Sequence, residues 1–82
     1  MLQHEIESIE FKGKVYNTWH GSPFDRGSAD SWYSRPVDPH WYPNGSYNGE
    51  RVEAVNMTKE ELEAYHAGYD YNEEFGGKKE WD

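Results

Sequence analysis

The sequence contains no cysteine, which excludes disulfide bonds, thiolate metal sites and cysteine nucleophiles together. It also lacks any apolar run approaching the roughly 18 residues that a membrane-spanning helix needs. Residues 1–10 carry three glutamates, where a secretory signal would need a basic start and an apolar middle. We therefore expect a cytoplasmic protein without a membrane-bound part.

Aliphatic side chains are scarce as well. Leu, Ile and Val number only 8 of 82 residues, and the formal net charge is -8, a combination typical of disordered chains. The aromatic content argues against disorder: 17% of the residues are Phe, Trp or Tyr, and each ring removes roughly 150 to 250 Å² from water when it is buried. We expect one small domain with an aromatic core over residues 1–77, followed by a flexible tail over residues 78–82.

Basic residues are outnumbered, with eight Lys and Arg against sixteen Asp and Glu. This balance disfavours direct binding to DNA or to an anionic lipid surface, because both carry negative charge. It favours basic or neutral partners. The sequence predicts neither the identity of a partner nor the oligomeric state.

Alternating apolar and polar residues over residues 5–19 predict a β-hairpin that turns at Lys12-Gly13-Lys14. A three-residue loop places Phe11 opposite Val15 and keeps the apolar side chains on one face, so we prefer it to a two-residue loop pairing Phe11 with Lys14. Residues 51–55 are candidates for a third strand, because an isolated hairpin is marginally stable in water.

A short helix is predicted from residue 23 to about residue 34. Ser22 is a favourable N-cap, Pro23 suits the first helical position, and Pro36 ends the helix. Residues 35–49 then hold three prolines together with three aromatic rings. Disordered linkers lack such rings, so we expect this segment to form an ordered loop over the core.

A long C-terminal helix is predicted from residue 59 to about residue 75. Thr58 and Glu61 have the spacing of a capping box at its start. Gly68 in the middle of the helix costs roughly 1 kcal/mol relative to Ala, which indicates that another group approaches the backbone closely there. Gly76-Gly77 would end the helix through a left-handed C-cap. The predicted fold class is α+β, with a hairpin of two or three strands, a short helix, an aromatic loop and one long helix.

Metal binding and catalysis find little support in the sequence. Glu63, His66 and Asp70 share a helical face, but such a face is usually solvated, and no His or carboxylate spacing diagnostic of a metal is present. Ser, His and Asp occur without any pattern specific to nucleophilic catalysis. We therefore expect no enzymatic activity, no metal and no cofactor.

Two binding hypotheses remain. Arg26, Arg35 and Arg51 lie among aromatic residues, as in modules that bind single-stranded RNA, although they can equally pair with Asp25, Asp30 and Asp38 around an aromatic core. Acidic residues on the long helix, with exposed rings as anchors, can instead bind a basic protein surface or mimic nucleic acid, unless they form only a solvated face. The candidate protein-binding residues are Glu60, Glu63, Asp70, Glu73 and Glu74 with Trp41 and Tyr42.

Two blocks of the sequence resemble small uncharacterised proteins of tailed bacteriophages and their hosts. These are PFDRGSAD at residues 23–30 and the EE..AYHAGYD pattern at residues 60–70, within a similarity covering roughly residues 20–75. The resemblance implies a phage accessory protein, acting in the host cytoplasm, and no particular mechanism.

A second similarity is to ribosome modulation factor. Arg26-Gly27, a proline-containing connection, and the aromatic-x-x-Gly-aromatic pattern at residues 65–69 match that family. The resemblance implies two packed helices and ribosome association, yet that family is strongly basic and this chain is acidic. We therefore predict a non-enzymatic phage protein that binds and inhibits a basic, nucleic-acid-binding host protein, with a ribosome- or RNA-associated module as the alternative.

Overall fold

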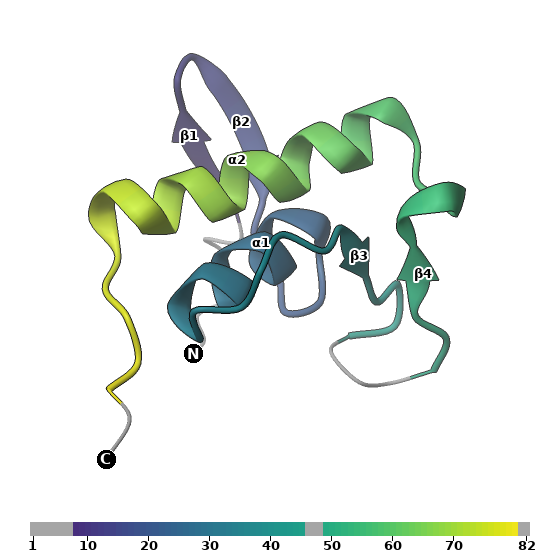
Figure 1. The fold of residues 1–82 in the computed structure, drawn as a ribbon. Coiled ribbons are helices and arrows are strands. Elements are labelled where there is room, and N and C mark those ends of the chain that lie inside the picture. The colour runs from purple at the N-terminus through teal and green to yellow at the C-terminus, as the bar shows by residue number, and fades with distance from the viewer. Residues whose placement is uncertain (1–7, 46–48, 81–82) are drawn as a thin grey trace, which may run out of the picture.

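Two crossing helices, flanked by two small antiparallel sheets, make up the computed structural model, which describes residues 8–45 and 49–80 (Figure 1). The predicted α+β class is confirmed. The elements in chain order are β1 (Ser8–Phe11), β2 (Lys14–Asn17), α1 (Pro23–Trp32), β3 (His40–Trp41), β4 (Val52–Glu53), the 3-10 helix η1 (Ala54–Asn56) and α2 (Lys59–Phe75).

The β1–β2 hairpin has a two-residue turn, so our prediction of a three-residue loop was wrong. Phe11 pairs with Lys14, and both turn residues have positive φ, 54° at Lys12 and 81° at Gly13. Such a turn is favoured in hairpins because its twist matches that of the strands. In this register Phe11 faces the helices and is 7% exposed, whereas Val15 lies on the outer face and is 66% exposed.

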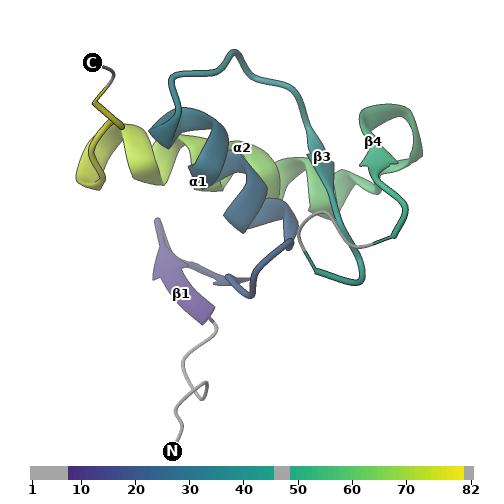
Figure 2. The same ribbon diagram turned by 90° about the horizontal axis from the view of Figure 1, so that it is seen from below.

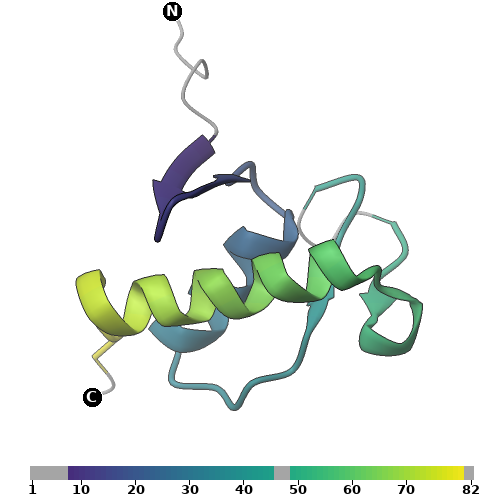
Figure 3. The same ribbon diagram turned by 90° about the horizontal axis from the view of Figure 1, so that it is seen from above.

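The predicted third strand does not join the hairpin. Residues 52–53 pair instead with β3, with His40 opposite Glu53 and Trp41 opposite Val52. The amide of Tyr42 donates to the carbonyl of Gly21 at 2.8 Å, which holds β3 beside the chain that enters α1. The second sheet therefore lies near the start of α2, away from the edges of the hairpin (Figures 1 and 3).

Both helices begin as predicted. The Ser22 hydroxyl accepts from the amide of Asp25 at 3.2 Å, with Pro23 in the first turn. The capping box of α2 is complete, because the Thr58 hydroxyl accepts from the amide of Glu61 while the Glu61 carboxylate accepts from the amide of Thr58. These short-range bonds satisfy amide groups that have no partner within the helix.

The end of α1 comes earlier than predicted and has a different cause. The helix ends at Trp32, and Ser34 takes a left-handed conformation with φ of 60°. The amide of Arg35 then bonds to the carbonyl of Asp30 at 2.8 Å, and that of Ser34 bonds to Ser31 at 3.0 Å. This Schellman motif stops the helix before Pro36 is reached.

Two glycines allow the helices to cross with their backbones in contact. A Cβ atom at Gly68 would lie 2.0 Å from the carbonyl oxygen of Phe24, and one at Gly27 would lie 2.0 Å from that of Tyr65. The close approach predicted at Gly68 is confirmed, and Gly27 is its counterpart on α1. Neither position has room for any side chain.

Around this crossing the core is aromatic, as predicted. Phe24 stacks on Tyr16 of the hairpin at 5.3 Å between ring centroids, and Phe11 meets Tyr71 of α2 edge-on at 5.4 Å. The hairpin covers one side of the helix pair, and the segment after α1 runs along the other (Figures 2 and 3). In the segment 35–49, which was predicted to form an ordered loop over the core, Tyr42 is buried. Residues 46–48, including Tyr47, lie outside the described residues.

Helix α2 ends at Phe75, as predicted, but the predicted left-handed cap is absent. Gly76 has φ of -88° and ψ of -170°, so it is not a left-handed cap. A Cβ atom there would lie 1.9 Å from the side-chain oxygen of Asn72, so any other residue would displace that side chain. The amide of Lys79 donates to the carbonyl of Trp32 at 2.7 Å, so the first part of the predicted flexible tail is held against α1. Trp81 lies outside the described residues.

Within residues 8–45 and 49–80, no helix combines the length and the apolar character that crossing a membrane requires.

Candidate functional site

A polar cluster between α1 and α2 contains the most deeply buried titratable groups. The hydroxyl of the fully buried Tyr65 donates to the carboxylate of Asp30 and accepts from the amide of Asp38 at 3.0 Å. His40 Nδ1 lies 2.7 Å from the carbonyl oxygen of Asp38. Burial, together with the hydrogen bond to Asp30, raises the pKa of Tyr65. Because Asp30 and His40 are also buried, the cluster joins the elements without offering an open face to a substrate.

All three arginines proposed for RNA binding form ion pairs within the chain. Arg26 is 5% exposed and bonds to Asp25 at 3.0 Å.

Arg35 lies 3.3 Å from Asp30 and over the ring of Tyr33, and Arg51 lies 2.8 Å from Asp38. These are the three carboxylates named in the alternative interpretation, in which the arginines support the core. The arrangement therefore favours that interpretation over an RNA-binding surface.

The five acidic residues proposed on α2 divide into two groups. Three form ion pairs within the chain: Glu63 with Lys14, Glu73 with Lys78, and Glu74 with Lys12. The hydrogen bond to Lys14 lowers the pKa of Glu63, and the one to Lys78 lowers that of Glu73.

Glu60 and Asp70 are exposed, and neither makes an ion pair with any other described residue. These two carboxylates are therefore the ones available to meet positive charge on a partner.

Of the two proposed aromatic anchors, only Trp41 keeps an accessible position. Tyr42 is 8% exposed and makes an edge-on contact with His40, so burial contradicts its predicted role as an anchor. Trp41 is half-buried and lies 6.1 Å from Trp19, between ring centroids, with 66° between the ring planes. The pair brings together the chain before α1 and strand β3.

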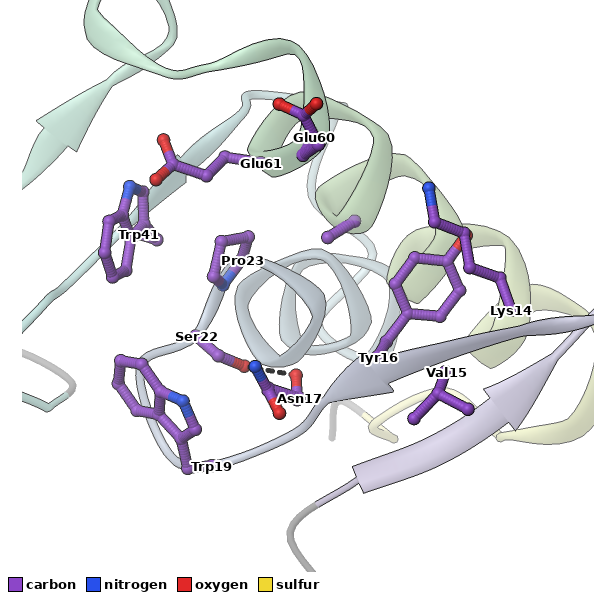
Figure 4. Close-up of a pocket in the computed structure, with 11 residues that line it drawn as sticks. Lys14, Val15, Tyr16, Asn17, Trp19, Ser22, Pro23, Trp41, Glu60 and Glu61 are labelled. Atoms are coloured by element: carbon purple, nitrogen blue, oxygen red, sulfur yellow. Dashed lines mark hydrogen bonds between the residues drawn. The ribbon is translucent and has the colours of Figure 1, made fainter.

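The two tryptophans form one end of a groove with a volume of about 330 Å³ (Figure 4). Pro23 forms its floor at the start of α1, and Tyr16 and Lys14 lie at the opposite end. Two carboxylates from the first turn of α2 complete the lining. The residues that line the groove include Tyr16, Trp19, Pro23, Trp41, Glu60 and Glu61.

Sequence reasoning missed Trp19 and Glu61 as groove residues. The alternating pattern over residues 5–19 predicts Trp19 on the apolar face of the hairpin, but β2 ends at Asn17, and a turn from Trp19 to Ser22 carries the ring toward β3. Glu61 was assigned only to the capping box. The available signal was a tryptophan three residues before the Ser22-Pro23 helix start, where the chain enters α1.

The groove carries net negative charge. Its lining contains one basic side chain, Lys14, which bonds to Glu63 at 2.6 Å. The hydrogen bond to Glu63 raises the pKa of Lys14, and the charge of Glu60 acts in the same direction. Glu60 and Glu61 remain on the rim.

The helical face considered for a metal does not form a site. No group of three or more His, Cys, Asp or Glu side chains suitable for a metal ion occurs in residues 8–45 and 49–80, a range that includes Glu63, His66 and Asp70.

No family model, curated protein or solved structure matches the chain.

Proposed function

We propose that this chain is a non-enzymatic, acidic protein-binding module that docks on the basic surface of a partner protein. The observation that carries the proposal is the groove, whose lining combines the paired rings of Trp19 and Trp41 with the side chains of Glu60 and Glu61. Tryptophan is among the residues that contribute most to binding at protein interfaces. Rim carboxylates add specificity and speed the encounter with a basic surface.

The charge distribution supports the same function. A net charge of -8 on 82 residues produces a field that attracts basic proteins and repels nucleic acid. Glu60 lies in the first turn of α2 and Asp70 lies in its C-terminal half, so this negative charge is spread along the helix. Following the resemblance to phage proteins, we infer a basic, nucleic-acid-binding host protein as the partner. In this arrangement the acidic helix occupies the surface that nucleic acid would otherwise use, and so inhibits the partner.

The proposal is tested by affinity capture from bacterial lysate, with and without nuclease treatment, comparing the wild-type chain with the Glu60→Lys/Asp70→Lys variant. Both positions are exposed, so the substitutions leave the core intact. The expected result is a basic protein retained by the wild-type chain, with or without nuclease, and lost by the variant. Retention of ribosomal proteins that disappears with nuclease and strengthens in the variant would overturn the proposal in favour of RNA association.

A further inference from the structure

The groove beside Trp19 and Trp41 has the size of a pocket for one long side chain. Its volume of about 330 Å³ lies at the lower end of the range of roughly 300 to 1,000 Å³ that is typical of small-molecule pockets. Its lining comes from β2, the start of α1, β3 and the start of α2, so the crossing helices hold it in place. Such a pocket accommodates a single anchoring residue of a partner.

The rings in the groove favour a flat cation. Trp19 and Trp41 are both half-buried, and the angle of 66° between them prevents them from stacking face to face on each other. Both rings stand at the same end of the groove (Figure 4). The face of an indole attracts a cation more strongly than the ring of Tyr or Phe. A planar guanidinium can also stack on such a face, which a compact ammonium group cannot do.

The charges in the groove favour the same ligand. Glu60 has no ion-pair partner among the described residues, and Glu61 uses one carboxylate oxygen to accept from the amide of Thr58 at 2.9 Å. Lys14 is occupied by Glu63. A guanidinium brought into the groove therefore meets carboxylate oxygens that fit its planar array of donors.

We propose that this groove binds an arginine side chain of the partner, with the guanidinium against the indole rings of Trp19 and Trp41 and facing Glu60. This inference rests on the proposed function and names the chemistry of its anchor. Trp41 Nε1 adds a further point of contact, because it is buried and has no acceptor among the described residues. An unsatisfied buried donor costs roughly 1 to 3 kcal/mol. It is therefore favourable for the ring to turn slightly and donate this N–H to a main-chain carbonyl of the bound segment.

The direct test is a ¹H–¹⁵N NMR titration with Nα-acetyl-arginine amide. The matched control ligand is Nα-acetyl-citrulline amide, which has nearly the same shape without the charge. We expect arginine amide to shift the indole N–H signals of Trp19 and Trp41 while leaving that of Trp32, on α1, in place. Equal shifts with citrulline amide, or shifts confined to signals outside the groove, would overturn the inference.

Two charge-matched variants sharpen the test. Glu60→Gln and Asp70→Asn each remove one negative charge from the exposed surface of α2, but only Glu60 lines the groove. We expect about threefold weaker binding of arginine amide to Glu60→Gln, the size typical of one exposed ion pair, and little change for Asp70→Asn. Equal weakening by both variants would show general electrostatic attraction and contradict a defined site.

The inference and the proposed function fail separately. Absence of groove shifts with arginine amide, together with charge-dependent capture of a basic protein, overturns the arginine pocket and leaves the protein-binding function standing. Groove shifts without any charge-dependent capture support the pocket and overturn the proposed function.

Discussion

Replacing Gly68 with Ala tests how the two helices cross. The added Cβ atom would lie 2.0 Å from the carbonyl oxygen of Phe24 and 2.8 Å from its carbonyl carbon. Carbon and carbonyl oxygen atoms ordinarily approach to about 3.3 to 3.6 Å, so the helices must move apart by roughly 1 Å or more. Because the two Phe24 atoms that the Cβ atom meets belong to the backbone, no side-chain rotation relieves the clash.

The expected magnitude follows from two opposing effects. Alanine in place of glycine favours a helix by about 1 kcal/mol. Overpacking a well-packed core costs typically about 1 to 3 kcal/mol, and here separation of the helices also loosens the contacts of Phe24, which is 3% exposed. With no side chain able to yield, we expect the upper end of that cost, and therefore a net loss of about 2 kcal/mol in the free energy of unfolding.

Urea denaturation followed by far-UV circular dichroism measures this loss. Asp70→Ala serves as the control, because it raises helix propensity on the exposed side of α2 without a clash. Gly27→Ala should destabilise in the same way, since its Cβ atom would meet the carbonyl oxygen of Tyr65 at 2.0 Å. A Gly68→Ala variant that is more stable than wild type by the roughly 1 kcal/mol of helix propensity would contradict a backbone contact at this position.

Three further predictions concern other contacts. Tyr65→Phe removes the hydroxyl that donates to the buried Asp30 carboxylate, which keeps the longer bond from Arg35 at 3.3 Å, and should lower the free energy of unfolding by about 1.5 to 3 kcal/mol. Because the pKa of Tyr65 is raised in the fold, the wild-type chain should also lose stability as pH rises above about 10, and Tyr65→Phe should reduce that loss in urea titrations. Gly13→Ala places a side chain at φ of 81° and should cost about 1 to 2 kcal/mol in thermal denaturation. Glu73→Gln should flatten the loss of stability as pH falls through about 4, because Lys78 lowers the pKa of Glu73 in the fold.

Each of these has a contradicting outcome. An alkaline transition unchanged in Tyr65→Phe would separate that transition from the buried phenol. Unaltered stability in Gly13→Ala would contradict the two-residue turn. An identical acid transition in Glu73→Gln would show that its pairing with Lys78 does not hold in solution.

Features encoded by neighbouring residues could be predicted from the sequence. The caps at Ser22 and Thr58 depend on groups three residues away, and both were found. The cost of glycine in a helix likewise pointed to the contact at Gly68. The length of the hairpin turn was predicted wrongly because the three-residue loop assumed that Val15 is buried. The left-handed conformation of Lys12 instead allows a two-residue turn, which places Val15 on the outer face.

Features that depend on distant segments could not be predicted. Nothing local shows that β4 pairs with β3, or that the turn after β2 brings Trp19 to Trp41. The buried bond between Asp30 and Tyr65 joins two helices and is equally invisible in the sequence. The candidate groove therefore emerged only from the fold, although Trp41 and Glu60 had already been named as candidate binding residues.

A basic partner held through an arginine in the groove should be released by an excess of free arginine side chains. The most direct test is elution of the captured protein with Nα-acetyl-arginine amide, compared with Nα-acetyl-citrulline amide supplemented with sodium chloride to equal ionic strength. Selective elution by arginine amide is the predicted result. Equal elution by the two solutions would show that general charge alone holds the partner, and would contradict the claim.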